Sequence, residues 1–454
     1  MKGVCKKISL LLLLTIPLIS CSIIPDRFII FKKPAVERDE TFAVTDDGDF
    51  FLAISVSGGG SRAAVWSSSV LNEIYRQVKL PDGRSILDEV DYISSVSGGS
   101  LSSAYYCMNK PTGDTTDTES FDTFFDIYTN DMRKNIEKEI VSIYKPWQWH
   151  RIFLRATDKG VILQKVIDDF FFNKSNFNDL YNRQRKRQCP TLIINGTVMD
   201  TGSKFLFTTL KRSDFTFDTL SRTGSFENTG IVRSNILLKR KGQGVTFTRD
   251  IGLSIGGMRI SKAVMASAGV PFLFGPVILK GTEVKGTKDI ALKRSLYLHV
   301  NDGGVADNLG LETVIQLMLR KFTERGNKYR GGLVIIIDAA HPIDPEDSTD
   351  SIKGFTSMGT LGRSLDIFDY RHKYFAFYNI LLIQQDPVFE NIRFVYVSPY
   401  LVDDPQIIEK IKAVGTRFMI EPDLAANLDE AARIVVGDLR KRILLNFEGK
   451  DVPE

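Results

Sequence analysis

The chain has 454 residues, of which 43% are apolar and 10% aromatic, and this composition is typical of a globular protein with a large core. Its net charge of +4 at pH 7 gives no sign of a nucleic-acid partner. With only four cysteines and four widely spaced histidines, the chain is not a disulfide scaffold, and no structural metal site is expected.

The first twenty residues have the pattern of a secretion signal. Three lysines within the first seven residues precede an apolar run over residues 8–19, and Ser20 and Cys21 follow. The run is shorter than the roughly 20 residues that a membrane-spanning helix needs. It resembles a bacterial lipoprotein signal, so we expect cleavage after Ser20 and a lipid on Cys21, with residues 21–48 as a tether. An ordinary signal peptide and an uncleaved anchor are the alternatives.

These expectations place the protein in the bacterial cell envelope, anchored to a membrane by its own lipid, with the choice of inner or outer membrane left open. Removing residues 1–20 would lower the net charge from +4 to about +1, because the segment holds three lysines and no acid. Cys107 and Cys189 would then be the only cysteines able to form a bridge.

The body of the chain opens with a predicted βαβ unit. Residues 50–56 are apolar apart from Ser55, as in a strand buried on both faces, and a glycine-rich loop over residues 57–62 follows. A helix with one apolar face comes next, and then a β-prone run that ends at Ser97. Parallel strands joined by such a crossover place their following loops at one edge of the sheet, so we expect the glycine loop and Ser97 to be neighbours.

The surroundings of Ser97 are typical of a nucleophile elbow. A strand stops at Ser97, Gly98 and Gly99 allow a sharp turn, and a helix begins, although Ser95 stands where the usual G-x-S-x-G has its first glycine. An ordinary strand-to-helix turn is the alternative. Consecutive glycines at residues 58–60 would let backbone N–H groups approach an oxyanion closely, and the chain there lacks the motifs of a phosphate-binding loop.

The next segment, residues 108–190, is predicted to be a helical insertion. It contains the aromatic stretch around Trp147 and Trp149, for which buried packing and a lipid-facing lid are both open. The basic run at residues 183–187 is interpreted as a solvated face, with contact to anionic lipid as the alternative.

The second half of the chain supplies one carboxylate of interest. Residues 192–199 and 204–210 are predicted to form a hairpin, and residues 211–250 an irregular β excursion. Ser267 lies in a small-residue helix and is interpreted as packing. An apolar strand then ends at Asp302, which is followed by two glycines; an active-site carboxylate and a simple turn aspartate are both compatible with this position. Asp307 is interpreted as a helix cap.

The motifs together resemble the patatin-like phospholipase family, over roughly residues 50–342. The matching segments are Gly58-Gly59-Gly60-Ser61-Arg62, Ser95-Val96-Ser97-Gly98-Gly99, Ala266-Ser267-Ala268-Gly269-Val270-Pro271 and Asp302-Gly303-Gly304. Ala63 and Ser95 stand where that family often has glycine. The resemblance implies an α/β fold, a three-layer sandwich with a mainly parallel central sheet and flanking helices, as an acyl hydrolase domain over residues 49–342. Residues 343–454 are expected to be a helical extension packed on it.

The resemblance also implies a Ser–Asp dyad. Ser97 would attack an ester carbonyl of a lipid or phospholipid and Asp302 would take its proton. The resemblance further implies an oxyanion hole and a supporting shell, in which no cofactor or metal takes part. The N–H groups of Gly59 and Gly60, with Gly58 as a further candidate, would hold the oxyanion, and the supporting residues would be Arg62, Gly98, Gly99 and Gly303.

Two other functions remain open from the sequence. A Ser-His-Asp hydrolase would use His341 with Asp302 or Asp338, which follow Ser97 in the right chain order. A patatin-like lipoprotein without catalysis, acting as a binding module, is the third possibility, permitted by Ser95 and Ala63.

Overall fold

The computed structural model describes most of the chain from residue 48 onward. The described residues are 48–134, 164–215, 245–269, 276–285, 292–323, 329–342, 357–414 and 420–449. The signal segment, Cys21, the tether up to residue 47 and the stretch with Trp147 and Trp149 lie outside them, as do most of residues 211–250.

Within the described ranges, nine strands form one sheet. They are β1 (Phe50–Val56), β2 (Tyr92–Val96), β3 (Thr191–Val198), β4 (Lys204–Thr208), β5 (Val245–Phe247), β6 (Val277–Lys285), β7 (Leu292–Asp302), β8 (Gly331–Ile337) and β9 (Ile392–Val397). The main order is β5-β4-β3-β2-β1-β8-β9. Within it, the neighbouring pairs β3–β2, β2–β1, β1–β8 and β8–β9 are parallel. The β3–β4 pair is antiparallel, as predicted. Strand β7 pairs antiparallel with both β3 and β6, so Asp302 at its end lies next to β3.

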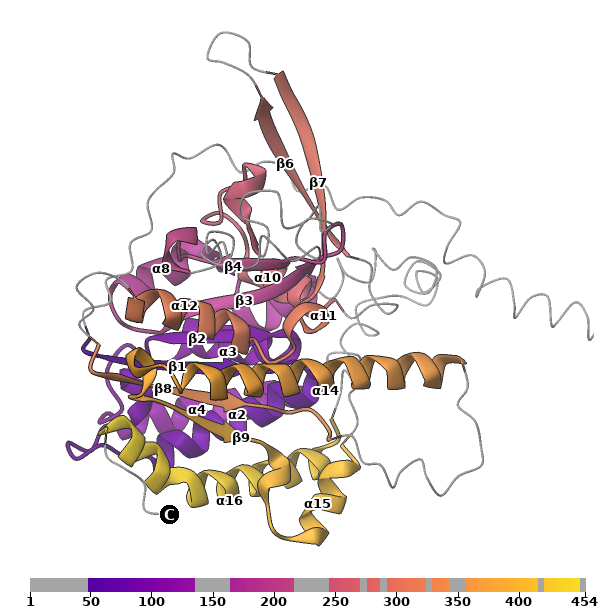
Figure 1. Ribbon diagram of the computed structural model, residues 1–454. Coiled ribbons are helices and arrows are strands. Elements are labelled where there is room, and N and C mark those ends of the chain that lie inside the picture. Colours follow the sequence, from indigo (N-terminus) through magenta and orange to yellow (C-terminus); the bar gives the residue numbers. More distant parts are fainter. Residues whose placement is uncertain are drawn as a thin grey trace, which may run out of the picture.

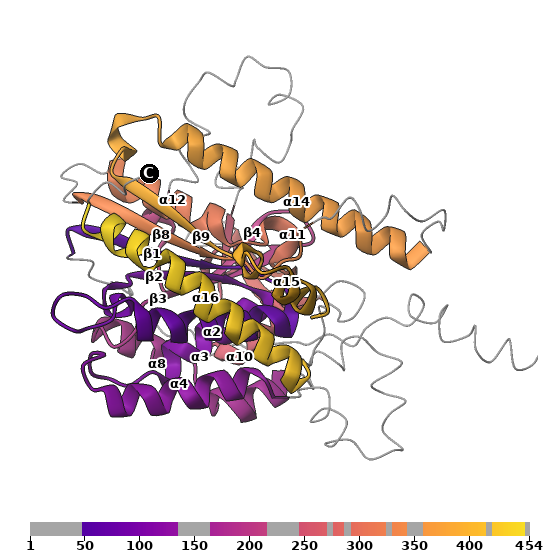
Figure 2. The same cartoon turned by 90° about the horizontal axis from the view of Figure 1, so that it is seen from below.

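Helices cover both faces of this sheet. Those of eight or more residues are α2 (Gly60–Gln77), α3 (Ser97–Asn109), α4 (Thr118–Met132), α8 (Phe177–Arg185), α10 (Ile260–Ser267), α12 (Leu311–Thr323), α14 (Ser357–Ile383), α15 (Pro405–Lys412) and α16 (Pro422–Phe447). A short helix, α11 (Gly304–Asp307), follows β7. Figures 1 and 2 show α2, α3, α4 and α16 on one side of the sheet and α12 and α14 on the other. The predicted three-layer α/β sandwich is therefore confirmed.

Strand β1 shows why the sequence folds in layers. Leu52 and Ile54 face the core under α2 and α16, whereas Phe51 and Ala53 face the core under α12. All seven residues of β1 are buried. Apart from Ser55, apolar residues are therefore required at the positions of β1 on both faces, as expected for a central strand of a parallel sheet.

The C-terminal part of the chain is more than a helical extension. Strand β9 adds to the sheet beside β8, in parallel register from Gly332–Ile392 to Ile337–Val397. Helix α16 packs along α2 in the core on the other side of β1. The expectation of a purely helical segment after residue 342 is thus wrong, because these residues complete one edge of the central sheet.

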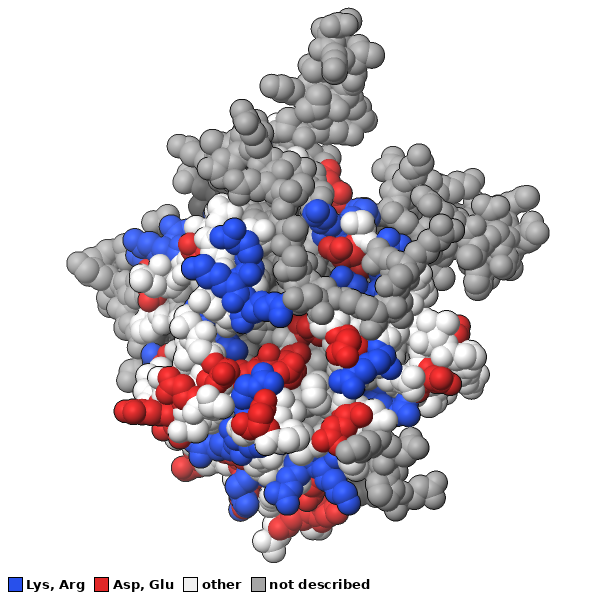
Figure 3. All heavy atoms as spheres, turned by 90° about the vertical axis from the view of Figure 1, so that its left-hand side faces the viewer, with Lys and Arg blue, Asp and Glu red and all other residues white. Residues whose placement is uncertain are grey.

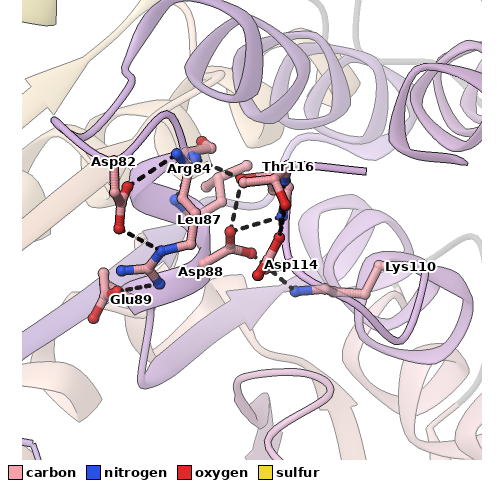
Figure 4. A network of polar contacts seen from close by, with 10 residues as sticks. Asp82, Arg84, Leu87, Asp88, Glu89, Lys110, Asp114 and Thr116 are labelled. Carbon is pink, nitrogen blue, oxygen red and sulfur yellow. Dashed lines mark hydrogen bonds and ion pairs between the residues drawn. The ribbon is translucent and has the colours of Figure 1, made fainter. Parts of the chain in front are cut away.

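A polar network supports the strand and the helix that meet at Ser97 (Figure 4). Asp88 precedes β2 and pairs at 3.9 Å with Lys110, the residue that caps α3. Arg84 and Glu89 form a second ion pair at 2.6 Å in the same turn. The network therefore fixes the far ends of β2 and α3 relative to one another.

Charges on the described surface are mixed. On the side of the molecule shown in Figure 3, acidic and basic side chains lie next to one another over much of the area. Within the described residues, no helix is both long enough and apolar enough to span a bilayer.

Candidate active site

Ser97 lies at the junction of β2 and α3 in a conformation that few non-glycine residues adopt. Its φ is 52°, in the left-handed region, while Val96 before it is extended. The side chain is only 3% exposed. A serine held in this way at a strand-to-helix turn has the geometry of a nucleophile elbow.

Asp302 meets Ser97 from the end of β7. The hydroxyl of Ser97 donates to Oδ2 of Asp302 at 3.1 Å, across 205 positions of sequence. The other carboxylate oxygen, Oδ1, accepts the N–H of Gly304 at 2.8 Å. The turn after β7 thus orients the carboxylate, and one of its oxygens is directed at the serine.

Burial sets the acidity of this carboxyl group. It raises the pKa of Asp302 to about 6, and the hydrogen bonds from Gly304 and Ser97 oppose that rise. An ordinary aspartate has a pKa of about 3.9 and is a weak base at neutral pH. Asp302 is therefore a stronger base than an exposed aspartate, yet it is still largely ionised at pH 7.

The glycine loop lies against the elbow, as its place after β1 predicted. A Cβ atom on Gly98 would lie 1.8 Å from the carbonyl oxygen of Gly60, and one on Gly58 would lie 3.3 Å from the Cβ of Ser97. A Cβ on Gly303 would lie 2.3 Å from the carbonyl oxygen of Asn195. The glycine loop thus meets the elbow, and the turn after β7 meets β3, at distances that leave no room for a side chain on Gly98 or Gly303.

The N–H groups of the glycine loop are of two kinds: one already donates to a backbone carbonyl, and the others lie at the start of a helix. Gly58 donates to the carbonyl of Asn308 at 2.9 Å, so its N–H group is occupied and is not a donor for an oxyanion, contrary to our expectation. Gly59 is the N-cap of α2 and Gly60 its first residue. N–H groups at this end of a helix have no acceptor within the helix and lie at the positive end of its dipole.

Ser267 has a role at the elbow that the sequence did not reveal. Its hydroxyl accepts the N–H of Ser97 at 2.9 Å and donates to the carbonyl of Asn195 at 2.6 Å. It lies at the end of α10 and is completely buried. The interpretation of Ser267 as packing alone is therefore wrong. The signal that could have found it is the motif match itself, which places this serine with the other three segments.

Asn195 joins the elbow to the neighbouring strands. Its Nδ2 atom donates to the carbonyl of Ser95 at 3.0 Å and to the hydroxyl of Ser94 at 2.9 Å, while its Oδ1 atom accepts from Thr313 at 2.7 Å. An asparagine directly after the apolar run Leu192–Ile194 was the available sign of this role. The replacement of the first elbow glycine is accommodated, because the Ser95 hydroxyl donates to the carbonyl of Ile193 at 3.3 Å.

Arg62 connects the glycine loop to the C-terminal region. It is 3% exposed, and its Nη1 atom donates to the carbonyl of Val414 at 3.1 Å. Burial lowers the pKa of the guanidinium, and the nearby Tyr400 and Asp338 oppose that effect. This position suits the bracing role expected for Arg62.

The alternative triad residues have other partners. The Nε2 atom of His341 lies 3.0 Å from the carbonyl of Val414, and its Nδ1 atom is bonded to the hydroxyl of Tyr400. Asp338 accepts from Tyr396 at 2.8 Å and pairs with Lys373 at 2.8 Å. Burial also lowers the pKa of His341 to about 4. Asp302, by contrast, accepts a hydrogen bond directly from the hydroxyl of Ser97.

Asp307, interpreted from sequence as a cap, does more than that. It accepts the N–H of Glu312 at 3.0 Å at the start of α12, and it pairs with the buried Lys204 at 2.8 Å. Cys107 and Cys189 are both buried free thiols. In the part of the chain that the structure describes, His, Cys, Asp and Glu side chains form no group of three that could hold a metal ion.

Comparison with known proteins gives one family match. A family model described as patatin-like phospholipase matches residues 54–315, more than half of the chain. The search of curated proteins gave no match.

Two solved structures illustrate the structural comparison. Human GIVD cytosolic phospholipase A2 is 11% identical, with a TM-score of 0.47 over 88% of this chain and 60% of that one. VipD from Legionella pneumophila is 10% identical, with a TM-score of 0.31 over 87% of this chain and 67% of that one. The present chain thus spans about 60% of the length of the human phospholipase chain.

Proposed function

The chain belongs to the patatin-like phospholipase family, a family of lipid acyl hydrolases, and from this premise we propose that it cleaves ester bonds of lipids with Ser97 as nucleophile and Asp302 as base. The observation that carries the proposal is the direct hydrogen bond from Ser97 to a buried carboxylate whose pKa burial raises to about 6. A phospholipid is the substrate class that fits the family.

In the first half of the reaction, Oγ of Ser97 attacks the ester carbonyl and its proton passes to Oδ2 of Asp302. The N–H groups of Gly59 and Gly60, at the start of α2, stabilise the negative oxygen of the tetrahedral intermediate. The intermediate then expels the alcohol, which takes the proton from Asp302. The acyl group stays on Ser97 as an ester.

In the second half, a water molecule attacks this acyl ester and gives a proton to Asp302. The second tetrahedral intermediate uses the same N–H groups, and its collapse returns the proton to Ser97 and releases the fatty acid. Arg62, Gly98, Gly99 and Gly303 support the loops through buried or very close contacts and take no part in bond making.

The proposal is tested by labelling with a serine-directed fluorophosphonate and digestion for mass spectrometry. An adduct on Ser97 that is lost in Asp302→Asn, with the variant still folded, is the expected result. A folded protein that neither reacts at Ser97 nor hydrolyses a lipid ester, with or without lipid micelles, would leave the binding module as the better account.

We also propose that the protein is held at a membrane of the bacterial envelope by lipid on Cys21. The support is the order of basic residues, apolar run and cysteine at the start of the chain. Metabolic labelling with a fatty acid should mark the wild-type protein and not Cys21→Ser. Equal labelling of the two would refute the anchor while leaving the hydrolase proposal intact.

A further inference from the structure

Helix α14 exposes an unusual amount of apolar surface. Of the fifteen exposed large apolar side chains among the described residues, eight lie on this helix, each 46% to 64% exposed. They are Ile367, Phe368, Tyr370, Tyr374, Phe375, Tyr378, Leu381 and Leu382, which we call the outer face of α14. Such a concentration on one element marks an interaction surface.

The opposite side of the same helix is already used for packing. Ile380 is buried in the core beneath α12, and Phe377 and Ile383 pack against that core. A helix in a globular protein normally has one apolar face and one polar face. Helix α14, by contrast, is apolar on both sides. Packing against the core uses only one of them, so the fold itself does not explain the apolar outer face.

We propose that the outer face of α14 docks on a lipid surface and holds the active-site edge of the sheet against it. The residue types favour lipid as the occupant, since five of the eight side chains are aromatic and three of these are tyrosines. Tyrosine concentrates at the boundary between head groups and acyl chains. Arg371 lies over the rings of Tyr374 and Phe375, with its Cζ atom 5.6 and 5.1 Å from their centroids, which places a cation at the same level.

The apolar surface continues into a hollow beside the helix. The hollow has a volume of about 610 Å³ and lies between α14, β9 and α16, and its lining is mixed, with Phe377, Leu381 and Phe394 beside Arg393 and Arg442. Leu381 belongs to both the outer face and the hollow. A lipid at the docked surface would therefore find both apolar and cationic contacts beyond the helix itself.

The helix is attached to the edge of the sheet where Ser97 and Asp302 lie. Lys373 pairs at 2.8 Å with Asp338, the residue that follows β8, and at 3.2 Å with Asp369 of the same helix. Helix α14 also contacts α11, the short helix that follows Asp302, and the carbonyl of Asn308 at the end of α11 accepts the N–H of Gly58. Figure 1 shows α14 running past α11 at this edge. A lipid surface on the outer face would thus lie beside the site that the substrate must reach.

Vesicle binding tests this inference without turnover. The chain from Ser22 onward, which contains every described residue, carries Ser97→Ala and is sedimented with vesicles of phosphatidylethanolamine and phosphatidylglycerol. Replacing Phe368 and Phe375 together by serine should lower the partition coefficient roughly tenfold or more, because two rings no longer leave water. The matched control is Ile127→Ser, which removes an apolar side chain of similar exposure from α4 and should leave binding unchanged.

A second measurement does not depend on the variants. Amide hydrogen exchange of the unsubstituted outer face should slow when vesicles are added. The inference is overturned if the chain does not bind vesicles, or if the double serine variant binds as well as the parent and the Ile127→Ser control. It is also overturned if ultracentrifugation shows that the outer face joins two copies of the chain in solution.

The role of the docked lipid as substrate rests on the proposed function. Measurements of ester hydrolysis distinguish the docking surface from the hydrolase proposal. With Ser97 intact, the double serine variant should keep its hydrolysis of a soluble short-chain ester and lose hydrolysis of vesicle lipid. Absence of ester hydrolysis in every form, together with vesicle binding through α14, would refute the hydrolase proposal and leave the docking surface standing.

Discussion

Ser97 and Asp302 are joined directly, with 3.1 Å between Oγ and Oδ2 and no imidazole between them. The serine comes from the end of a parallel strand and the aspartate from the end of an antiparallel one, and both strands neighbour β3. Because Asp302 is the only hydrogen-bond partner of the Ser97 hydroxyl within the part of the chain that the structure describes, its acidity should control the reaction.

The pH dependence of hydrolysis should therefore report Asp302. Burial raises its pKa to about 6, so the base is protonated below that pH and free above it. We expect kcat/KM for a soluble ester to rise about tenfold per pH unit below pH 6 and to level off above it. A midpoint that stays the same in a variant lacking the Asp302 carboxylate would assign the profile to another group.

The stability of Asp302→Asn should exceed that of the wild type by an amount that depends on pH. The carboxyl group has a higher pKa in the folded protein than in the unfolded chain, so the folded state binds the proton more tightly and loses stability as pH rises from about 4 to above 6. The amide keeps an acceptor for Gly304 and a donor for Ser97 but does not ionise. The advantage of the variant should grow by up to about 3 kcal/mol between pH 4 and pH 8 in denaturant titrations. An advantage that is constant over this range would contradict the buried ionisation.

Much of the site was predictable because its parts lie where strands end. The mainly apolar run of β1 and the glycines after it, followed by the run up to Ser97, specify a βαβ crossover. Such a crossover places the two loops side by side. Asp302 could be matched to Ser97 only through the family resemblance, since 205 residues separate them and local pattern carries no information on that distance.

Other parts depend on tertiary packing and leave weak local signals. Ser267 contacts the elbow because α10 ends against β3, which no periodicity in its own helix indicates. Gly58 was grouped with its neighbours because the three glycines look alike in sequence, yet the carbonyl of Asn308 distinguishes it. Strand β9 was missed because its inward-facing apolar residues lie in a segment between helices, and its pairing with β8 is what reveals it.

Replacement of His341 separates the dyad from a triad. His341 bonds to the carbonyl of Val414 and the hydroxyl of Tyr400, so His341→Ala should lower stability, by roughly 1 to 3 kcal/mol, and reduce kcat/KM only a few-fold. The measurement is steady-state hydrolysis of a soluble ester by protein shown to be folded, with Asp302→Asn in parallel as the variant that should lose almost all activity. A loss in His341→Ala as large as that of Asp302→Asn would instead support a Ser-His-Asp enzyme.

Ser267 should act on the reaction by positioning the nucleophile. Its removal leaves the N–H of Ser97 and the carbonyl of Asn195 without their partner in a buried site. In Ser267→Ala we expect kcat to fall roughly tenfold to a hundredfold, because Ser97 is no longer held in its left-handed conformation. KM should change little, and the pH midpoint set by Asp302 should stay the same.

The matched control is Ser261→Ala, which removes an equally buried hydroxyl from the same helix. The Ser261 hydroxyl donates to Asp168 at 2.9 Å, away from the elbow. Both variants should lose roughly 1 to 3 kcal/mol of stability, since each leaves a buried polar group unsatisfied. Only Ser267→Ala should lose turnover. Equal stability losses with wild-type kcat in both would mean that Ser267 supports the fold and not the geometry of Ser97.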